Sequence, residues 1–264
     1  MNLFLRELRA HRRSLIIWCL GMLAMVGGGM SKYSGMAGAG QSLNSLFASL
    51  PKSLQVIFGV GDFDLGTAMG FYAVLYLYIA VIGAVHAAML GAEIIAKEER
   101  DKTVEFLLAK PVSRHSIISA KLIAGLVNLI VLNLFTFTAS IVIMSRYDQV
   151  QAVAGDIGRL TAGLFLLQLI FFTVGTGMAA TNKNAKAAAP RATAILLAAF
   201  LVAVATGLSN DPAVLKYLTP FEYYSAQSIL VDGVAVTYHI LTVIIIAVMI
   251  ALTYAYYQKR DMNV

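Results

Sequence analysis

Charge and cysteine are scarce in this chain. Only 13% of its 264 residues are Asp, Glu, Lys or Arg, whereas 59% are hydrophobic and the mean hydropathy is +0.77. Soluble domains are about 45–50% apolar and about 25% charged, so the composition excludes an ordinary soluble protein. The one cysteine, Cys19, has no partner for an intrachain disulfide and lies in an apolar run, where we expect it to fill apolar space.

Catalytic and metal-binding patterns are missing as well. The four histidines are far apart in the sequence, and no metal-ligand spacing is present. The sequence has no G-x-x-x-x-G-K-[ST] phosphate-binding loop, so the chain cannot bind ATP in that way. We therefore expect that the chain is not an enzyme and that it has no catalytic residue, no metal and no cofactor.

Polar groups inside the apolar runs are few. No Asp or Glu lies in the middle of a run, which argues against a carrier coupled to protons or sodium, because such carriers usually keep ionisable groups in the membrane. His86 lies well inside a run, where it is either a proton or substrate contact or a hydrogen-bonded packing residue. Asn128, Asn133 and Gln168 are expected to form hydrogen bonds between helices.

Six long apolar runs are the main feature that the sequence does have. Crossing a hydrocarbon core about 30 Å thick takes about 20 apolar residues, and one charge at mid-bilayer costs about 2.5–3.5 kcal/mol. The five prolines lie outside the cores of the runs, as helix boundaries require. We therefore predict an all-α membrane protein with a single transmembrane domain, residues 1–264. Its six spans are predicted near 14–31, 66–95, 117–145, 159–182, 191–209 and 234–258.

Lys and Arg are distributed unevenly around these spans. With the N-terminus placed inside the cell, fifteen of the 20 lie in inner segments and five in outer loops. Inner segments of membrane proteins carry the excess of Lys and Arg, so both termini are predicted to be cytoplasmic. The net charge of +6 follows from this topology and does not indicate nucleic acid, because no basic patch is interleaved with exposed aromatic residues.

The first thirteen residues are basic and amphipathic. Phe4 and Leu8 fall on one helical face and Arg9 falls away from it. This spacing predicts a helix over 1–13 that lies in the inner headgroup region before the chain turns into the first span. A solvated basic tail is the alternative. A cleaved signal peptide is disfavoured, because its small-residue cleavage site at 37–39 lies about ten residues beyond the apolar run.

Two helical stripes indicate how the bundle is built. Apolar residues between Leu43 and Phe58 recur at helical spacing and predict an amphipathic helix, bent at Pro51, on the outer surface. Structural cover is its simpler role, and capping of a translocation path is the alternative. In the second span, small residues at every fourth position predict close approach of another helix, from this chain or a second one. They are Ala80, Ala84, Ala88 and Ala92.

A dense charged block lies between the second and third spans. It extends from about 97 to 111 in a chain that has few charges elsewhere. Asp101 is a suitable cap for a short helix whose Val104, Leu107 and Leu108 share a face, and Pro111 ends it. From the residues alone, an ordinary solvated loop is the simpler explanation, and an interface with a partner in water is the alternative.

The block resembles the most recognisable segment of the type 2 ABC exporter permeases. Their pattern is an acidic pair, a Thr-x-Glu-x-Leu-Leu helix, Pro-(Val/Ile)-Ser-Arg, and a lysine that opens the third span. The matching positions are Glu98-Glu99, Thr103 to Leu108, Pro111 to Arg114, and Lys121. The basic N-terminal helix, the six spans and a Pro-Phe-x-Tyr segment at Pro220 extend the resemblance over the whole chain. It is most similar to the small permeases of bacterial drug- and peptide-resistance exporters.

The resemblance implies a coupling helix and a set of partners. In that family two permeases associate in the bilayer, and each loop between spans two and three docks on an ATPase subunit. The expected partners are therefore two copies of an ABC ATPase and a second permease, identical or different. The implied location is the bacterial cytoplasmic membrane. The implied coupling residues are Glu98, Glu99, Arg100, Asp101, Lys102, Thr103, Val104, Glu105, Phe106, Leu107 and Leu108.

The function that follows is export of an amphiphile by a permease subunit, with ATP hydrolysed in a separate chain. Apolar and aromatic span walls without charge indicate a drug, peptide or lipid as the substrate. A membrane scaffold or sensor that uses an ATPase without transport is the alternative. An intramembrane enzyme is disfavoured, because the sequence contains no catalytic cluster.

Overall fold

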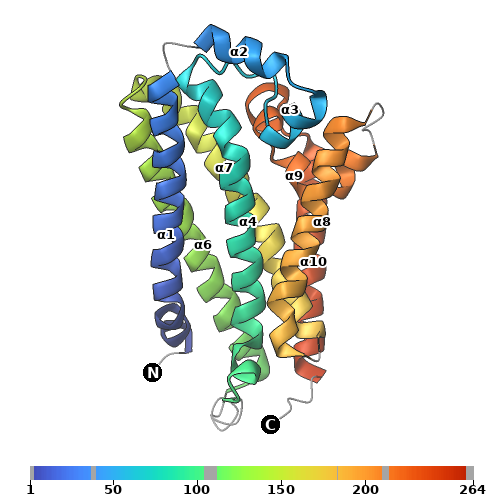
Figure 1. Cartoon of the computed structure of the whole chain (residues 1–264). Coiled ribbons are helices and arrows are strands. Elements are labelled where there is room, and N and C mark those ends of the chain that lie inside the picture. Colours follow the sequence, from blue (N-terminus) through green and yellow to red (C-terminus); the bar gives the residue numbers. More distant parts are fainter. Residues whose placement is uncertain (1–2, 37–39, 104–111, 183, 210–213, 260–264) are drawn as a thin grey trace.

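The computed structural model describes residues 3–36, 40–103, 112–182, 184–209 and 214–259, and within them the chain is helical, with no β-strand. Six of the described helices are long and apolar enough to cross a membrane, which confirms the predicted all-α membrane fold. They are α1 (Leu3–Met36), α4 (Ala68–Arg100), α6 (Arg114–Met144), α7 (Val150–Thr181), α8 (Ala188–Leu208) and α10 (Val236–Lys259). Figure 1 shows them side by side in one bundle.

Shorter helices connect the long ones. Two lie between α1 and α4, one precedes α8, and three lie between α8 and α10. They are α2 (Gly40–Ala48), α3 (Lys52–Phe58), the 3-10 helices η2 (Ala185–Ala187) and η3 (Leu215–Leu218), α9 (Pro220–Tyr223), and the π-helical turn η4 (Ser228–Asp232). α1 begins and α10 ends at the same end of the bundle, as the predicted topology requires (Figure 1).

The long helices extend beyond the predicted spans. α4 continues to Arg100, so the first part of the charged block belongs to the helix of the second span. The region predicted as a separate N-terminal helix is continuous with the first span from Leu3 to Met36. Figure 1 shows its first turns end-on and the rest from the side, so α1 changes direction near its start. Placement of these turns in the headgroup region stays a prediction.

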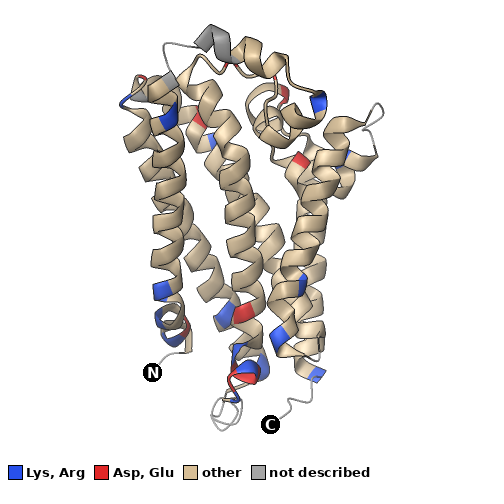
Figure 2. Cartoon of the chain, viewed as in Figure 1, with Lys and Arg blue, Asp and Glu red and all other residues tan. Residues whose placement is uncertain are grey.

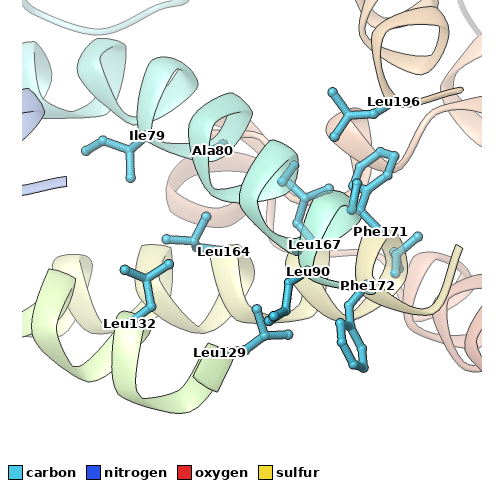
Figure 3. Packing of buried hydrophobic residues seen from close by; sticks show 14 of the residues in the cluster. Ile79, Ala80, Leu90, Leu129, Leu132, Leu164, Leu167, Phe171, Phe172 and Leu196 are labelled. Carbon is cyan, nitrogen blue, oxygen red and sulfur yellow. The ribbon is translucent and has the colours of Figure 1, made fainter. Parts of the chain in front are cut away.

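The centre of the bundle is the contact between α4 and α7. A Cβ added at Gly91 would lie 2.1 Å from the carbonyl oxygen of Phe172, and one at Gly175 would lie 2.3 Å from that of Ala88. The two backbones therefore touch, as small residues in membrane helices allow. The partner of the alanine strip predicted in the second span is thus α7 of the same chain. Figure 3 shows Leu164, Leu167 and other buried residues filling the space around this contact.

The peripheral helices are much less buried. α1, α8 and α10 expose large apolar side chains such as Ile17, Leu201 and Val243 along their length. A helix that is apolar on its outer face is stable next to lipid or against another membrane chain. The outer faces of these three helices are therefore the surfaces that the bundle offers to its surroundings.

One end of the bundle is covered by α2 and α3. The segment predicted as one amphipathic helix bent at Pro51 forms two helices that are separated at this proline. Asn44 connects α2 to the start of α4, because its Nδ2 donates to Asp64 (2.6 Å) and its Oδ1 accepts from the Leu65 amide (3.0 Å). The hydroxyl of Tyr33 on α1 donates to the Gly66 carbonyl (3.0 Å). We call this end the capped end.

Candidate functional site at the charged end

The opposite end of the bundle holds most of the charge, and we call it the charged end. Figure 2 shows Lys, Arg, Asp and Glu gathered where α1 begins and α4 ends, near the start of α8 and the end of α10. Of the predicted coupling residues, Glu98, Glu99, Arg100, Asp101, Lys102 and Thr103 lie at this end. Val104, Glu105, Phe106, Leu107 and Leu108 lie outside the described residues.

The end of α4 has a defined turn. The Thr103 amide donates to the Glu98 carbonyl (2.8 Å), and the Lys102 amide donates to the Glu99 carbonyl (3.4 Å). These two bonds form the Schellman arrangement, which satisfies the last carbonyls of a helix. Lys102 has φ +55°, a left-handed conformation that favours glycine. The chain therefore leaves α4 in a fixed direction, at the cost of some backbone strain.

Glu98 does not lie on the surface. Its side chain is 7% exposed and accepts from Nζ of Lys121 (2.5 Å, on Oε2) and from Nη2 of Arg6 (3.0 Å, on Oε1). The Lys121 side chain is fully buried and also donates to the Ile94 carbonyl. A buried charge is tolerated when it is paired and hydrogen-bonded. This carboxylate therefore connects α4 to α6 and α1.

A second carboxylate extends the network along α1. Glu7 is almost completely buried and pairs with Arg6 (Nη2 to Oε1, 2.9 Å). Its other oxygen and Nε2 of the buried His11 have no hydrogen-bond partner among the described residues. Arg6 is one third exposed and bridges the two carboxylates. We call Arg6, Glu7, Glu98 and Lys121 the ion network.

The described residues from Arg100 to Thr103 face water. Arg100 pairs with Asp101 (3.1 Å) and with Glu93 (3.5 Å), and all three side chains are at least one third exposed. Lys102 and Thr103 are exposed as well. Exposed ion pairs of this kind contribute about 0–1 kcal/mol to stability. These residues present alternating charges at the surface. Such charges contribute more to the choice of a binding partner than to the stability of the fold.

Ser113 and Arg114 lie where α6 begins, and Arg114 attaches this end of α6 to α10. Ser113 caps α6 by accepting from the Ser116 amide (3.2 Å). Arg114 donates to the carbonyls of Gln258 (2.9 Å) and Tyr257 (3.3 Å) at the end of α10. A guanidinium on the last carbonyls of a helix satisfies them and is favoured by the helix dipole.

Polar groups within the spans form contacts between helices, as predicted for Asn133 and Gln168. Nδ2 of Asn133 on α6 donates to Oε1 of Gln168 on α7, and Nε2 of Gln168 donates to the Gly83 carbonyl on α4 (3.2 Å). The His86 ring packs against Trp18 with ring centroids 5.1 Å apart. Nδ1 of His86 and Oδ1 of Asn128 have no hydrogen-bond partner among the described residues, so the bond between helices predicted for Asn128 is not seen through this oxygen. The contact with Trp18 supports the packing interpretation of His86.

The ion network is not predicted by the sequence patterns described above. The resemblance assigns Lys121 to the opening of the third span, yet Lys121 lies seven residues inside α6, which begins at Arg114. A lysine two turns inside an apolar helix needs an anionic partner. The position of Lys121 is therefore a sequence signal for a buried ion pair. Glu7, the one carboxylate in a basic segment, was the second signal.

The described residues define a polytopic membrane subunit with one charged end and no metal-binding cluster. Residues 1–262 match the model of a family described as ABC-2 family transporter protein, and the chain belongs to this family. It is therefore a membrane permease component of an ABC transporter, a transport subunit that is not itself catalytic and whose partner is an ATP-binding subunit. A search of curated proteins found no match.

Proposed function

We propose that this chain is the permease of an exporter that moves an amphiphilic drug, peptide or lipid out of the cytoplasm. ATP is hydrolysed by two copies of a separate subunit, and a second permease, identical or different, completes the complex. Both termini lie in the cytoplasm of a bacterial cell, so the charged end is the cytoplasmic end. The fifteen-to-five distribution of Lys and Arg supports this orientation.

In this proposal, residues 98–108 couple ATP hydrolysis to the membrane helices. The observation that carries it is the division of the block into an inward anchor and an outward surface. Glu98 is held by Lys121 and Arg6, whereas Asp101 to Thr103 are exposed. A partner on the exposed part would act on a segment that is joined to α1 and α6 through Glu98, and Arg114 extends the connection to α10.

The division gives the two parts of the block different roles. Glu98 positions the coupling segment and does not touch the ATPase. Glu99, Arg100, Asp101 and Lys102 form a charged rim, and the apolar face of Val104, Leu107 and Leu108 forms the core of the interface. Interfaces commonly combine an apolar core with a polar rim, and rim charges affect partner choice and association rate.

The test is Leu107→Asp in the chain co-expressed with its ATP-binding subunit. An unpaired carboxylate in an interface core costs at least a few kcal/mol, so we expect the subunit to be lost on purification while the chain stays in the membrane. Leu46→Asp is the matched control, because Leu46 is 56% exposed on α2 at the capped end. Normal retention by Leu107→Asp would contradict the docking assignment.

Reconstitution separates export from scaffolding. We expect proteoliposomes that contain both subunits to move a labelled amphiphile when ATP is hydrolysed, and the purified chain alone to hydrolyse no ATP. A complex that forms and hydrolyses ATP but moves no amphiphile would favour the scaffold or sensor alternative.

A further inference from the structure

An apolar cavity of about 640 Å³ lies at the capped end between α1, α4 and the cover made by α2 and α3. Its volume falls within the roughly 300–1,000 Å³ of small-molecule sites, which are mostly apolar with a few polar groups. The lining includes Gly28 and Lys32 on α1, the rings of Phe47 and Phe58, and Phe71 and Tyr78 on α4. No residue of the ion network lines this cavity, which lies at the other end of the bundle.

Glycine keeps the cavity open. α1 and α4 touch at Gly29, where an added Cβ would lie 2.5 Å from Cδ2 of Leu75. A Cβ added at the neighbouring Gly28 would meet no heavy atom within 4 Å. The two helices are therefore in close contact at Gly29 and leave open space at Gly28. Phe47 and Phe58 close the top, with ring centroids 6.2 Å apart in an edge-to-face arrangement.

The charge that lines the cavity is of one sign. Lys32 is its one ionisable lining residue apart from the Tyr78 phenol, and no carboxylate lines it. Lys32 is exposed and has no ion-pair partner among the described residues. The lining on α1 extends from Ala24 to Lys32, about 12 Å along the helix at about 1.5 Å per residue. An ammonium group thus lies at one end of an apolar space about two turns deep.

We propose that this cavity binds an alkyl or acyl chain of an anionic amphiphile whose headgroup pairs with Lys32. The chain fills the apolar space between α1 and α4, where it leaves water. The headgroup stays at the mouth, where Lys32 is solvated. Binding at this site requires neither the ATP-binding subunit nor transport in either direction. The binding proposal can therefore be tested independently of the proposed function.

The experiment uses the full-length chain in phosphatidylcholine nanodiscs and a photoactivatable fatty acid as the probe. A monoacylglycerol with the same photoactivatable chain is the neutral counterpart. We expect saturable labelling by the fatty acid within 24–32 and 65–78, and weaker labelling by the neutral probe. Labelling only at the outer faces of α8 and α10, or equal labelling by both probes, would overturn the proposal.

Two pairs of variants test the cavity and the charge separately. A Cβ at position 28 meets no heavy atom within 4 Å, so Gly28→Leu should extend its side chain into the cavity and abolish saturable labelling. Gly21→Leu, also on α1 with open space around its Cβ but outside the cavity lining, should not. Lys32→Gln should weaken fatty-acid binding about two- to fivefold, as loss of an exposed ion pair predicts. Lys52→Gln, at the same end but away from the cavity lining, should leave binding unchanged.

Two results would overturn the proposed binding site. Equal labelling of wild type and Gly28→Leu would show that the chain binds elsewhere and would overturn the site. Unlabelled wild type that cross-links to a second copy through α1 would show that another permease covers the cavity, which would also overturn it. Both outcomes leave retention of the ATP-binding subunit unaffected, so neither contradicts the proposed function.

Discussion

The same two helices, α1 and α4, are joined differently at the two ends of the bundle. At the charged end, Arg6 on α1 pairs with Glu98 on α4 at 3.0 Å. At the capped end the helices touch at Gly29 and Leu75, and beside that contact they enclose an apolar cavity. One end is held by paired charges and the other leaves space that a ligand can fill.

The two kinds of contact differ in their physical properties. A buried ion pair has strict geometry, because each charge that loses its partner is left in a medium of low dielectric. Apolar packing has no such direction, so an alkyl chain can replace a neighbouring side chain at little cost. The charged end is therefore suited to transmit a displacement, and the capped end is suited to accept a ligand.

The largest expected effect comes from breaking the ion network. Glu98→Gln leaves the buried ammonium of Lys121 without its anion and should destabilise the chain by about 3–5 kcal/mol. The double variant Glu98→Gln/Lys121→Met should recover much of this loss, because it removes the isolated charge. Thermal unfolding of the purified chain measures both. Glu93→Gln, with a partly exposed carboxylate, is the control, and an equal loss there would contradict the assignment.

The α4–α7 contact should be the next most sensitive site, because it supports both ends. Gly91→Ala places a Cβ 2.1 Å from the Phe172 carbonyl oxygen and forces the backbones apart, at a cost of about 1–3 kcal/mol. Gly155→Ala on α7 has open space around the new Cβ and should stabilise slightly, since alanine favours helix. Equal melting temperatures for the two variants would show that the close approach is unimportant.

The turn after α4 should respond to the left-handed residue. Lys102→Val places a β-branched side chain at φ +55° and should destabilise the turn by about 1–2 kcal/mol, whereas Lys102→Gly relieves the strain at this position and should not destabilise it. Hydrogen exchange of the Thr103 amide reports this turn locally. Similar exchange in the two variants would show that the turn does not hold the coupling segment.

The smallest expected effect is a pH dependence confined to the capped end. Hydrogen bonds from Asn44 and from the Gly66 amide hold the pKa of Asp64 below its usual value of 3.8. A carboxyl with a lowered pKa adds stability that is complete above the ordinary value and disappears as the pH falls through the lowered one. Protection of the 44–67 segment from proteolysis should therefore decrease only under strongly acid conditions. Asp64→Asn should remove this dependence, and its persistence would contradict the cause.

Much of the fold was accessible from the sequence. Charge-free runs located the six spans, and Pro51 located the break between α2 and α3, because both signals are local. The small strip at Ala84 and Ala88 predicted close packing, although its partner, α7, required the three-dimensional arrangement.

The two ends of the bundle were harder to predict. The inward direction of Glu98 depends on how far α4 continues past the predicted span, and one additional turn changes which side chains face the bundle. The cavity depends on two adjacent glycines: a Cβ added at Gly29 would clash with Leu75, whereas one added at Gly28 would meet no heavy atom within 4 Å. A sequence does not distinguish two such neighbours, because the distinction comes from the crossing point of α1 and α4.

Site-specific photo-cross-linking at Thr103 tests the central claim most directly. Thr103 is exposed at the charged end, directly after the turn that ends α4, and Asp62 is an equally accessible position at the capped end. With a photoreactive amino acid at each position in turn, the account predicts a cross-link from 103 to the ATP-binding subunit and none from 62. A cross-link from 62 and none from 103 would contradict the assignment of the charged end as the coupling surface.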